Sequence, residues 1–128
     1  MENWKRLKVW EKAHSLVIKI YRVTKDFPQD ERYRLIDQIC RSVISIPTNI
    51  VEGQSRNTTK EYLQFLYNAR GSLEETRYHL LLAKDLRYLT LDRYEGIEEK
   101  CKEVSLMLNS LIKSLKKKTG LEREQDLL

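Results

Sequence analysis

The sequence predicts an all-α fold, an antiparallel up-down-up-down bundle of four helices in which the second helix is kinked at Pro47. The 128-residue chain holds only 4 Gly and 2 Pro, too few turn residues for a β-sandwich or barrel. Charged residues make up 34% and apolar residues 41%, a balance typical of surface-charged helices rather than of disorder. Apolar residues recur every three or four positions, which places them on one face of each helix.

The first helix is predicted from an apolar stripe over residues 9–24. It ends before Phe27 and Pro28, because a residue that precedes proline is disfavoured in the α region. Residues 1–27 hold seven cations and three carboxylates, an excess of four in a chain total of +5. The cations that share one arc opposite the apolar stripe are Lys5, Lys8, Lys12, Lys19 and Arg22.

The second helix is predicted to begin near Asp30 and Glu31, because acidic side chains favour a helix N-terminus. It runs to Gly53, which we expect to be its C-cap. Pro47 lies inside this pattern, where it removes a backbone hydrogen bond and clashes with the carbonyl of Val43. The apolar stripe resumes in phase after the proline, so we expect a kink rather than a break.

The third and fourth helices complete the bundle. The third is predicted to start at a capping box formed by Thr58 and Glu61 and to continue to about Tyr88. The fourth follows Thr90 and ends at Gly120, and its apolar positions alternate steps of three and four. Because the connections are short, neighbouring helices are expected to be antiparallel. The apolar positions of the fourth helix are Tyr94, Ile97, Cys101, Val104, Leu108, Leu111 and Leu115.

The length allows one domain, which we place at residues 1–120, followed by a mobile C-terminal tail at residues 121–128. The longest apolar run is only residues 80–83, and the N-terminus lacks the core of a signal peptide. We therefore expect a cytoplasmic protein that does not engage membranes. Cys40 and Cys101 lie at apolar helical positions, so we expect both to be reduced core residues.

The sequence offers little for catalysis. His14 and His79 are the only histidines, and both lie at the border of an apolar face. Nucleotide-binding, hydrolase and zinc-protease motifs are absent, and no histidine follows a glutamate at the spacing of a di-iron bundle. We expect no enzyme activity, no catalytic or metal site, no cofactor and no small-molecule substrate.

A second basic cluster, at the end of the fourth helix, would lie beside Lys5, Arg6 and Lys8 in an antiparallel bundle. Such a region is typical of proteins that bind a phosphate backbone. The alternative is a solvated helix face with lysines that complement a helix dipole. The cluster consists of Lys113, Lys116, Lys117 and Lys118.

The third and fourth helices have more apolar surface than one bundle core requires. A second apolar stripe usually indicates another subunit, so we expect self-association. The additional apolar residues are Leu63, Tyr67, Leu81, Leu82, Leu106, Met107 and Ile112.

Residues 45–56, SIPTNIVEGQSR, together with LKVWEKAHSLVIKIYRVTKDFP, YRLIDQICRS and FLYNARGSLEETRYHLLLAKDLRYL, resemble the four-helix-bundle family of 23S rRNA-intervening-sequence proteins. The resemblance implies a bacterial homopentameric ring. Some members are encoded in insertions within large-subunit ribosomal RNA genes. A relative is the accessory protein of diversity-generating retroelements, which is thought to act with a reverse transcriptase and RNA.

The family motif also marks residues that we interpret as structural. Gly71 and Ser72 would allow a close approach of helices, and polar residues near Pro47 would form hydrogen bonds around the kink. Arg41 would pair with Glu75 across helices, and we count it with the basic residues, although Cys40 replaces the second arginine common beside it. The structural set is Pro47, Asn49, Glu52, Gly53, Arg56, Gly71, Ser72 and Glu75.

Taken together, these patterns predict a non-enzymatic homo-oligomer that binds RNA or DNA through its basic surface. The alternative is a structural or adaptor ring that binds another protein and has no nucleic-acid role.

Overall fold

The computed structural model describes residues 3–120, which form four α-helices and two short 3-10 helices with no strand among them. The predicted all-α, four-helix fold is confirmed. The predicted tail at residues 121–128 lies outside the described residues. The elements are η1 (Asn3–Arg6), α1 (Lys8–Thr24), η2 (Gln29–Glu31), α2 (Leu35–Gln54), α3 (Thr59–Asp85) and α4 (Leu91–Thr119).

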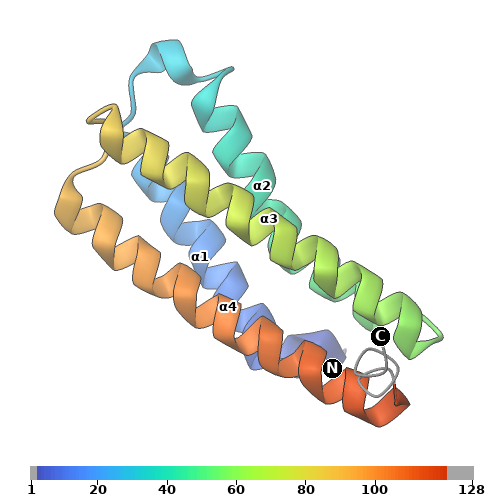
Figure 1. The fold of residues 1–128 in the computed structure, drawn as a ribbon. Helices are drawn as coiled ribbons and strands as arrows, with labels where there is room; N and C mark the ends of the chain where they lie inside the picture. The colour runs from blue at the N-terminus through green and yellow to red at the C-terminus, as the bar shows by residue number, and fades with distance from the viewer. Residues whose placement is uncertain (1–2, 121–128) are drawn as a thin grey trace, which may run out of the picture.

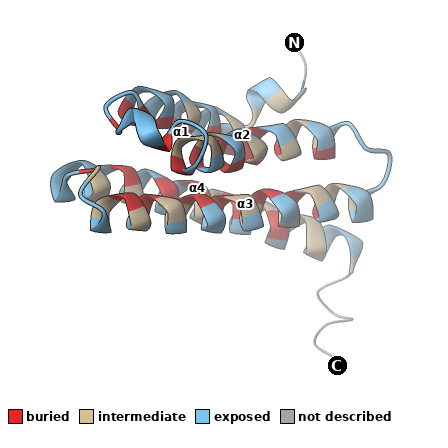
Figure 2. Cartoon of the chain, turned by 90° about the horizontal axis from the view of Figure 1, so that it is seen from above, coloured by how far each residue is buried: buried red, intermediate tan, exposed pale blue. Residues whose placement is uncertain are grey.

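The helices lie side by side, and successive helices run in alternate directions along the bundle (Figure 1). Each helix packs against the next in the chain, and α1 also packs against α4, which closes the bundle. Seen from above, the buried residues face inward between the pair α1–α2 and the pair α3–α4 (Figure 2). The largest fully buried side chains include Leu16, Ile20, Ile39, Ile46, Leu66, Leu73, Leu80, Ile97 and Leu108. Within residues 3–120, no helix is long and apolar enough to cross a bilayer.

The start of α2 differs from the prediction. The helix begins at Leu35, and the acidic segment before it forms the separate 3-10 helix η2. Glu31 is buried there, with its carboxylate accepting a hydrogen bond of 2.8 Å from the hydroxyl of Tyr88. Arg34 lies 3.4 Å from the other carboxylate oxygen. Glu31 therefore ties the α1–α2 connection to the segment between α3 and α4 instead of capping a helix.

The end of α2 also differs, because Gly53 is not the C-cap. The helix continues to Gln54, and Ser55 is the C-cap. Gly53 is buried against α3, where an added Cβ would lie 2.9 Å from Phe65 Cβ and 2.9 Å from Tyr62 Cδ1. The glycine is thus needed for close packing of two helices. Pro47 lies inside the unbroken helix, and the kink stays a prediction.

The ends of α3 and α4 follow local rules. Thr58 caps α3 as predicted, and its hydroxyl accepts the backbone N–H of Glu61 at 3.2 Å. The helix ends at Asp85, earlier than predicted, because Arg87 adopts a left-handed conformation with φ of 65°. The N–H of Tyr88 then reaches back 2.9 Å to a carbonyl of the last turn. Gly120 ends α4 with φ of 78°, as predicted.

The supposed second apolar stripe is partly core. Leu63 is 2% exposed and Ile112 is 3% exposed, so these two residues pack inside the bundle and offer nothing to another subunit. Leu106, by contrast, is 71% exposed, and Leu81 is 37% exposed. The apolar surface left over is therefore smaller than the sequence suggested and is concentrated at a few positions.

Both cysteines are free thiols. Cys101 is fully buried in the core, as predicted, and burial raises the pKa of its thiol to about 12. Cys40 is only partly buried, so its assignment to the core is wrong. Burial raises the pKa of the Cys40 thiol as well, and its sulfur lies 4.0 Å from the hydroxyl of Thr24.

Candidate nucleic-acid interface

The strongest candidate site is a groove between α1 and α4, with a volume of about 330 Å³, here called the basic groove. Lys19 and Arg22 stand on one face of α1, one turn apart, and Lys100 reaches the same groove from α4. His14 lies at one edge, stacked on Trp10 with ring centroids 5.1 Å apart. The residues that line the basic groove are His14, Ser15, Ile18, Lys19, Arg22 and Lys100.

The charge of the basic groove is not compensated by nearby carboxylates. Asp26, at the end of α1, is held by Arg93 of α4 at 3.1 Å. Glu103, one turn beyond Lys100 on α4, is held by Lys12 at 3.2 Å. Within residues 3–120, no ion pair is formed by the remaining cations of this surface. Those cations are Lys19, Arg22, Lys25 and Lys100.

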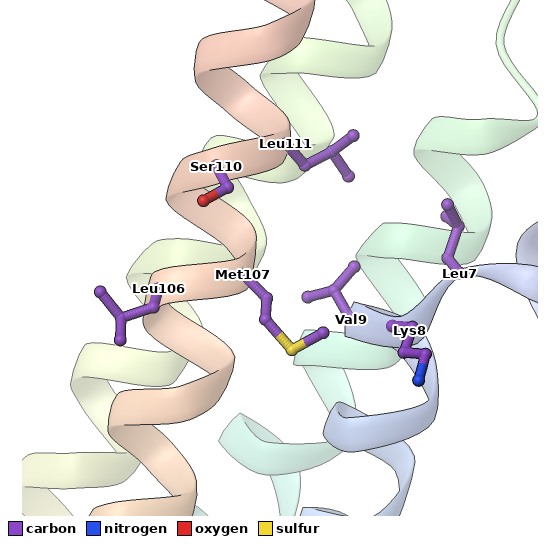
Figure 3. Close-up of a pocket in the computed structure, with 7 residues that line it drawn as sticks. All are labelled: Leu7, Lys8, Val9, Leu106, Met107, Ser110 and Leu111. Atoms are coloured by element: carbon purple, nitrogen blue, oxygen red, sulfur yellow. The ribbon is translucent and has the colours of Figure 1, made fainter.

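The predicted basic face of the first helix is therefore divided. Lys12 is neutralised by Glu103, so it adds little to the local field. Lys8 lines a different groove, which is mainly apolar (Figure 3). Lys5 lies over the ring of Trp4, with its Nζ 5.3 Å from the ring centroid, and Arg6 is exposed in η1. Of the cations predicted for the first helix, Lys19 and Arg22 are the two that line the basic groove.

The terminal lysines of α4 lie at the same end of the bundle as the start of α1 (Figure 1). Lys116, however, is directed towards α3, where its Nζ is 5.6 Å from the centroid of the Tyr67 ring. The guanidinium of Arg70 lies 5.1 Å from the same ring. The other three members of the cluster, Lys113, Lys117 and Lys118, are exposed.

Arg41 does not join the basic groove and does not pair with Glu75, so that prediction is wrong. Its guanidinium lies 3.9 Å from Asp37 on its own helix, and the side chain is 76% exposed. Glu75 instead lies 3.9 Å from Nε2 of His79. Both residues thus interact within a single helix, where the spacing of four residues brings side chains together.

The family motif forms a polar seam where α2 packs against α3. The hydroxyls of Ser45 and Ser72 are 2.8 Å apart, and Asn49 donates to the Ser45 hydroxyl at 2.9 Å. One turn away, the buried Thr76 donates to Ser42 at 2.8 Å. These short side chains let the helices approach closely while their polar atoms remain hydrogen-bonded. The seam is therefore structural.

Other members of the motif are placed differently. Gly71 is exposed, and an added Cβ would meet nothing within 4 Å, so the predicted close approach at this glycine is wrong. The guanidinium of Arg56 lies 4.5 Å from the centroid of the Phe65 ring, next to Gly53. Glu52 is exposed. The motif marks one helix contact and its surroundings, and none of these residues faces the basic groove.

Sequence reasoning missed Lys100 as part of the basic groove and Lys25 as a cation beside it. The local sequence of α4 holds no signal for Lys100, because its role depends on which turn of α4 lies beside Lys19 and Arg22. Lys25 follows Arg22 and Tyr21 by one turn and could have been found by extending the basic face of α1. Among residues 3–120, no group of three or more His, Cys, Asp or Glu side chains is placed to hold a metal ion.

This chain is similar to a known protein family and to a solved structure. A family model described as 23S rRNA-intervening sequence protein matches residues 5–110. The crystal structure of a protein of unknown function from the S23 ribosomal protein family of Bacteroides thetaiotaomicron is similar, with a TM-score of 0.74 and 28% identity. The match covers 82% of this chain and 98% of that chain. No curated protein matches.

Proposed function

The chain belongs to the 23S rRNA-intervening sequence protein family, and from that premise we propose that it is a non-enzymatic homo-oligomer that binds RNA or DNA. Its phosphate contacts are made in the basic groove. The observation that carries this proposal is the set of cations in and beside this groove, Lys19, Arg22, Lys25 and Lys100, which form no ion pair within residues 3–120. Such cations gain affinity for a phosphate backbone because binding releases condensed counterions.

Fluorescence anisotropy with a labelled RNA tests the basic groove through the double variant Lys19→Glu and Lys100→Glu. We expect affinity to fall at least about tenfold at about 50 mM salt. The slope of log affinity against log salt concentration should decrease in magnitude by about two, one unit for each phosphate contact removed. The matched control reverses Lys60 on α3 and Lys102 on the outer side of α4, both exposed. This control changes net charge equally, so equal losses in both variants would contradict the proposed site. Binding that does not weaken between about 50 and 200 mM salt would contradict phosphate contacts altogether.

Self-association has its own support. Leu106 projects from α4 and is 71% exposed at the edge of an apolar groove of about 320 Å³ between α4 and the start of α1 (Figure 3). Leu7, Val9 and Met107 provide its apolar walls. An exposed leucine beside such a groove favours contact with protein, and the family resemblance suggests a pentamer.

Light scattering measures the assembly directly. We expect a mass that is a multiple of 15.3 kDa, with five copies as the proposed number. Leu106→Glu, which places a charge in the apolar contact, is expected to shift the population towards smaller species. Leu91→Glu is the control, because Leu91 is 60% exposed but lies outside this groove. A mass of 15.3 kDa for the unmodified chain at micromolar concentration would contradict self-association.

A further inference from the structure

We propose that the basic groove binds single-stranded nucleic acid in preference to duplex, with an unpaired base stacked on Tyr21. This inference rests on the proposed function and specifies its ligand. It draws on two further features of the same surface: an apolar recess beside the cations, and the way α1 is embedded among its neighbours.

The recess has a volume of about 360 Å³ and is almost entirely apolar in character. It shares Ile18 and Arg22 with the basic groove, so the two hollows form one continuous surface along α1. Tyr21 is 41% exposed and Ile18 is 40% exposed, both large apolar side chains next to uncompensated cations. We call this the tyrosine recess, and its lining residues are Val17, Ile18, Tyr21, Arg22 and Lys25.

This combination distinguishes between the two kinds of nucleic acid. Duplex DNA or RNA presents phosphates and groove edges, and its base faces are covered by stacking. Only a single strand offers base faces, which gain affinity from an aromatic ring while cations follow the backbone. An apolar recess would add nothing to a purely phosphate-binding surface. Its position between Arg22 and Lys25 therefore favours a ligand with exposed bases.

Tyr21 is suited to act as a stacking platform, because its side chain is 41% exposed beside the cations. Its hydroxyl lies near the thiol of Cys40 on α2. Partial burial and the nearby thiol raise the pKa of this hydroxyl above its usual value. The phenol therefore stays neutral at physiological pH and places no negative charge beside an incoming phosphate.

The surroundings of α1 argue against insertion into a duplex. A recognition helix enters the major groove, which is about 12 Å wide, and must project from its domain to do so. Here α1 packs against both α2 and α4, and it does not project from the bundle (Figures 1 and 2). A flexible single strand can instead follow the shallow surface formed by the basic groove and the tyrosine recess.

Paired binding measurements test the inference on the full chain. The probes are a labelled oligouridine of about 12 nucleotides and a mixed-sequence RNA duplex of the same length, both at about 100 mM salt. We expect the single strand to bind at least about tenfold more tightly than the duplex. Tyr21→Ala is expected to weaken single-strand binding about tenfold and leave duplex binding unchanged, whereas Tyr21→Phe retains most of the affinity.

Tyr33→Ala is the matched control, because Tyr33 is 84% exposed and lines neither the basic groove nor the tyrosine recess. We expect it to change neither affinity. Duplex binding that equals or exceeds single-strand binding would overturn the inference, as would Tyr21→Ala acting equally on both probes. If Tyr21→Ala changes the mass in solution and not the affinity, the surface is a protein interface and the inference fails.

The failure of the inference can be told apart from failure of the proposed function. If reversing Lys19 and Lys100 weakens both probes while Tyr21→Ala weakens neither, phosphate binding stands and the preference for single strands is wrong. If the unmodified chain binds neither probe at about 50 mM salt, the proposed function and the inference are both wrong.

Discussion

Gly53→Ala is expected to lower the free energy of unfolding by about 2 kcal/mol, measured by urea denaturation. The added Cβ would lie 2.9 Å from both Phe65 Cβ and Tyr62 Cδ1, distances that force α2 and α3 apart. Phe65 Cβ is attached directly to the backbone of α3, so it cannot rotate away. Overpacking of this kind costs about 3 kcal/mol, and the better helix propensity of alanine returns about 1 kcal/mol.

Gly71→Ala is the matched control for that substitution. Gly71 also lies inside a helix and in the family motif, but an added Cβ there would meet nothing within 4 Å. Its only effect should be the gain in helix propensity, so we expect stability to rise by about 1 kcal/mol. The difference between the two variants, about 3 kcal/mol, isolates the packing term. Equal effects of the two substitutions would contradict the close approach at Gly53.

Arg77→Met is expected to lower the free energy of unfolding by about 3 kcal/mol, because it leaves a carboxylate in the bundle without its partner. Nε of Arg77 on α3 donates to Oε1 of Glu98 on α4 at 3.0 Å, and Nη1 donates to Glu74 at 2.9 Å. The side chain of Glu98 is only 15% exposed. The hydrogen bond between Arg77 and Glu98 raises the pKa of Arg77 above its already high value. The guanidinium therefore remains charged throughout the pH range of folding experiments.

Two further variants identify the cause of that loss. In the Arg77→Met background, Glu98→Gln should restore more than half of the lost stability, because the unpaired charge is removed. Arg93→Met breaks the cross-helix pair with Asp26, whose side chains are 55% and 68% exposed, and is expected to cost at most about 1 kcal/mol. If Arg93→Met costs as much as Arg77→Met, burial is not the reason for the difference.

Local signals predicted some helix ends correctly and failed where distant residues intervene. Thr58 and Gly120 were identified correctly because capping depends on only a few neighbouring residues. Gly53 had the appearance of a C-cap, but its role is set by Phe65 across the helix interface. Glu31 resembled a helix-start residue, yet its carboxylate is bonded to Tyr88. In both cases a tertiary contact overrides the local preference.

The candidate site was predictable only in part for the same reason. The basic face of α1 can be read from periodicity, and it includes Lys19 and Arg22, which line the basic groove. Whether a lysine is neutralised depends on the helix opposite, and Glu103 removes Lys12 from the effective charge. The apolar stripe misled similarly, because periodicity cannot tell that Leu63 faces the core and Leu106 faces outward. The sequence pattern of a single helix does not show its register and orientation against the neighbouring helices.

The course of the chain has a practical consequence for tethering. The 3-10 helix η1 and the last turn of α4 lie at the same end of the bundle (Figure 1). Lys19 lies eleven residues beyond the start of α1, about 16 Å along the helix at 1.5 Å per residue. A label attached within η1 or at the last turn of α4 would therefore leave Arg22 and Lys100 accessible from solution.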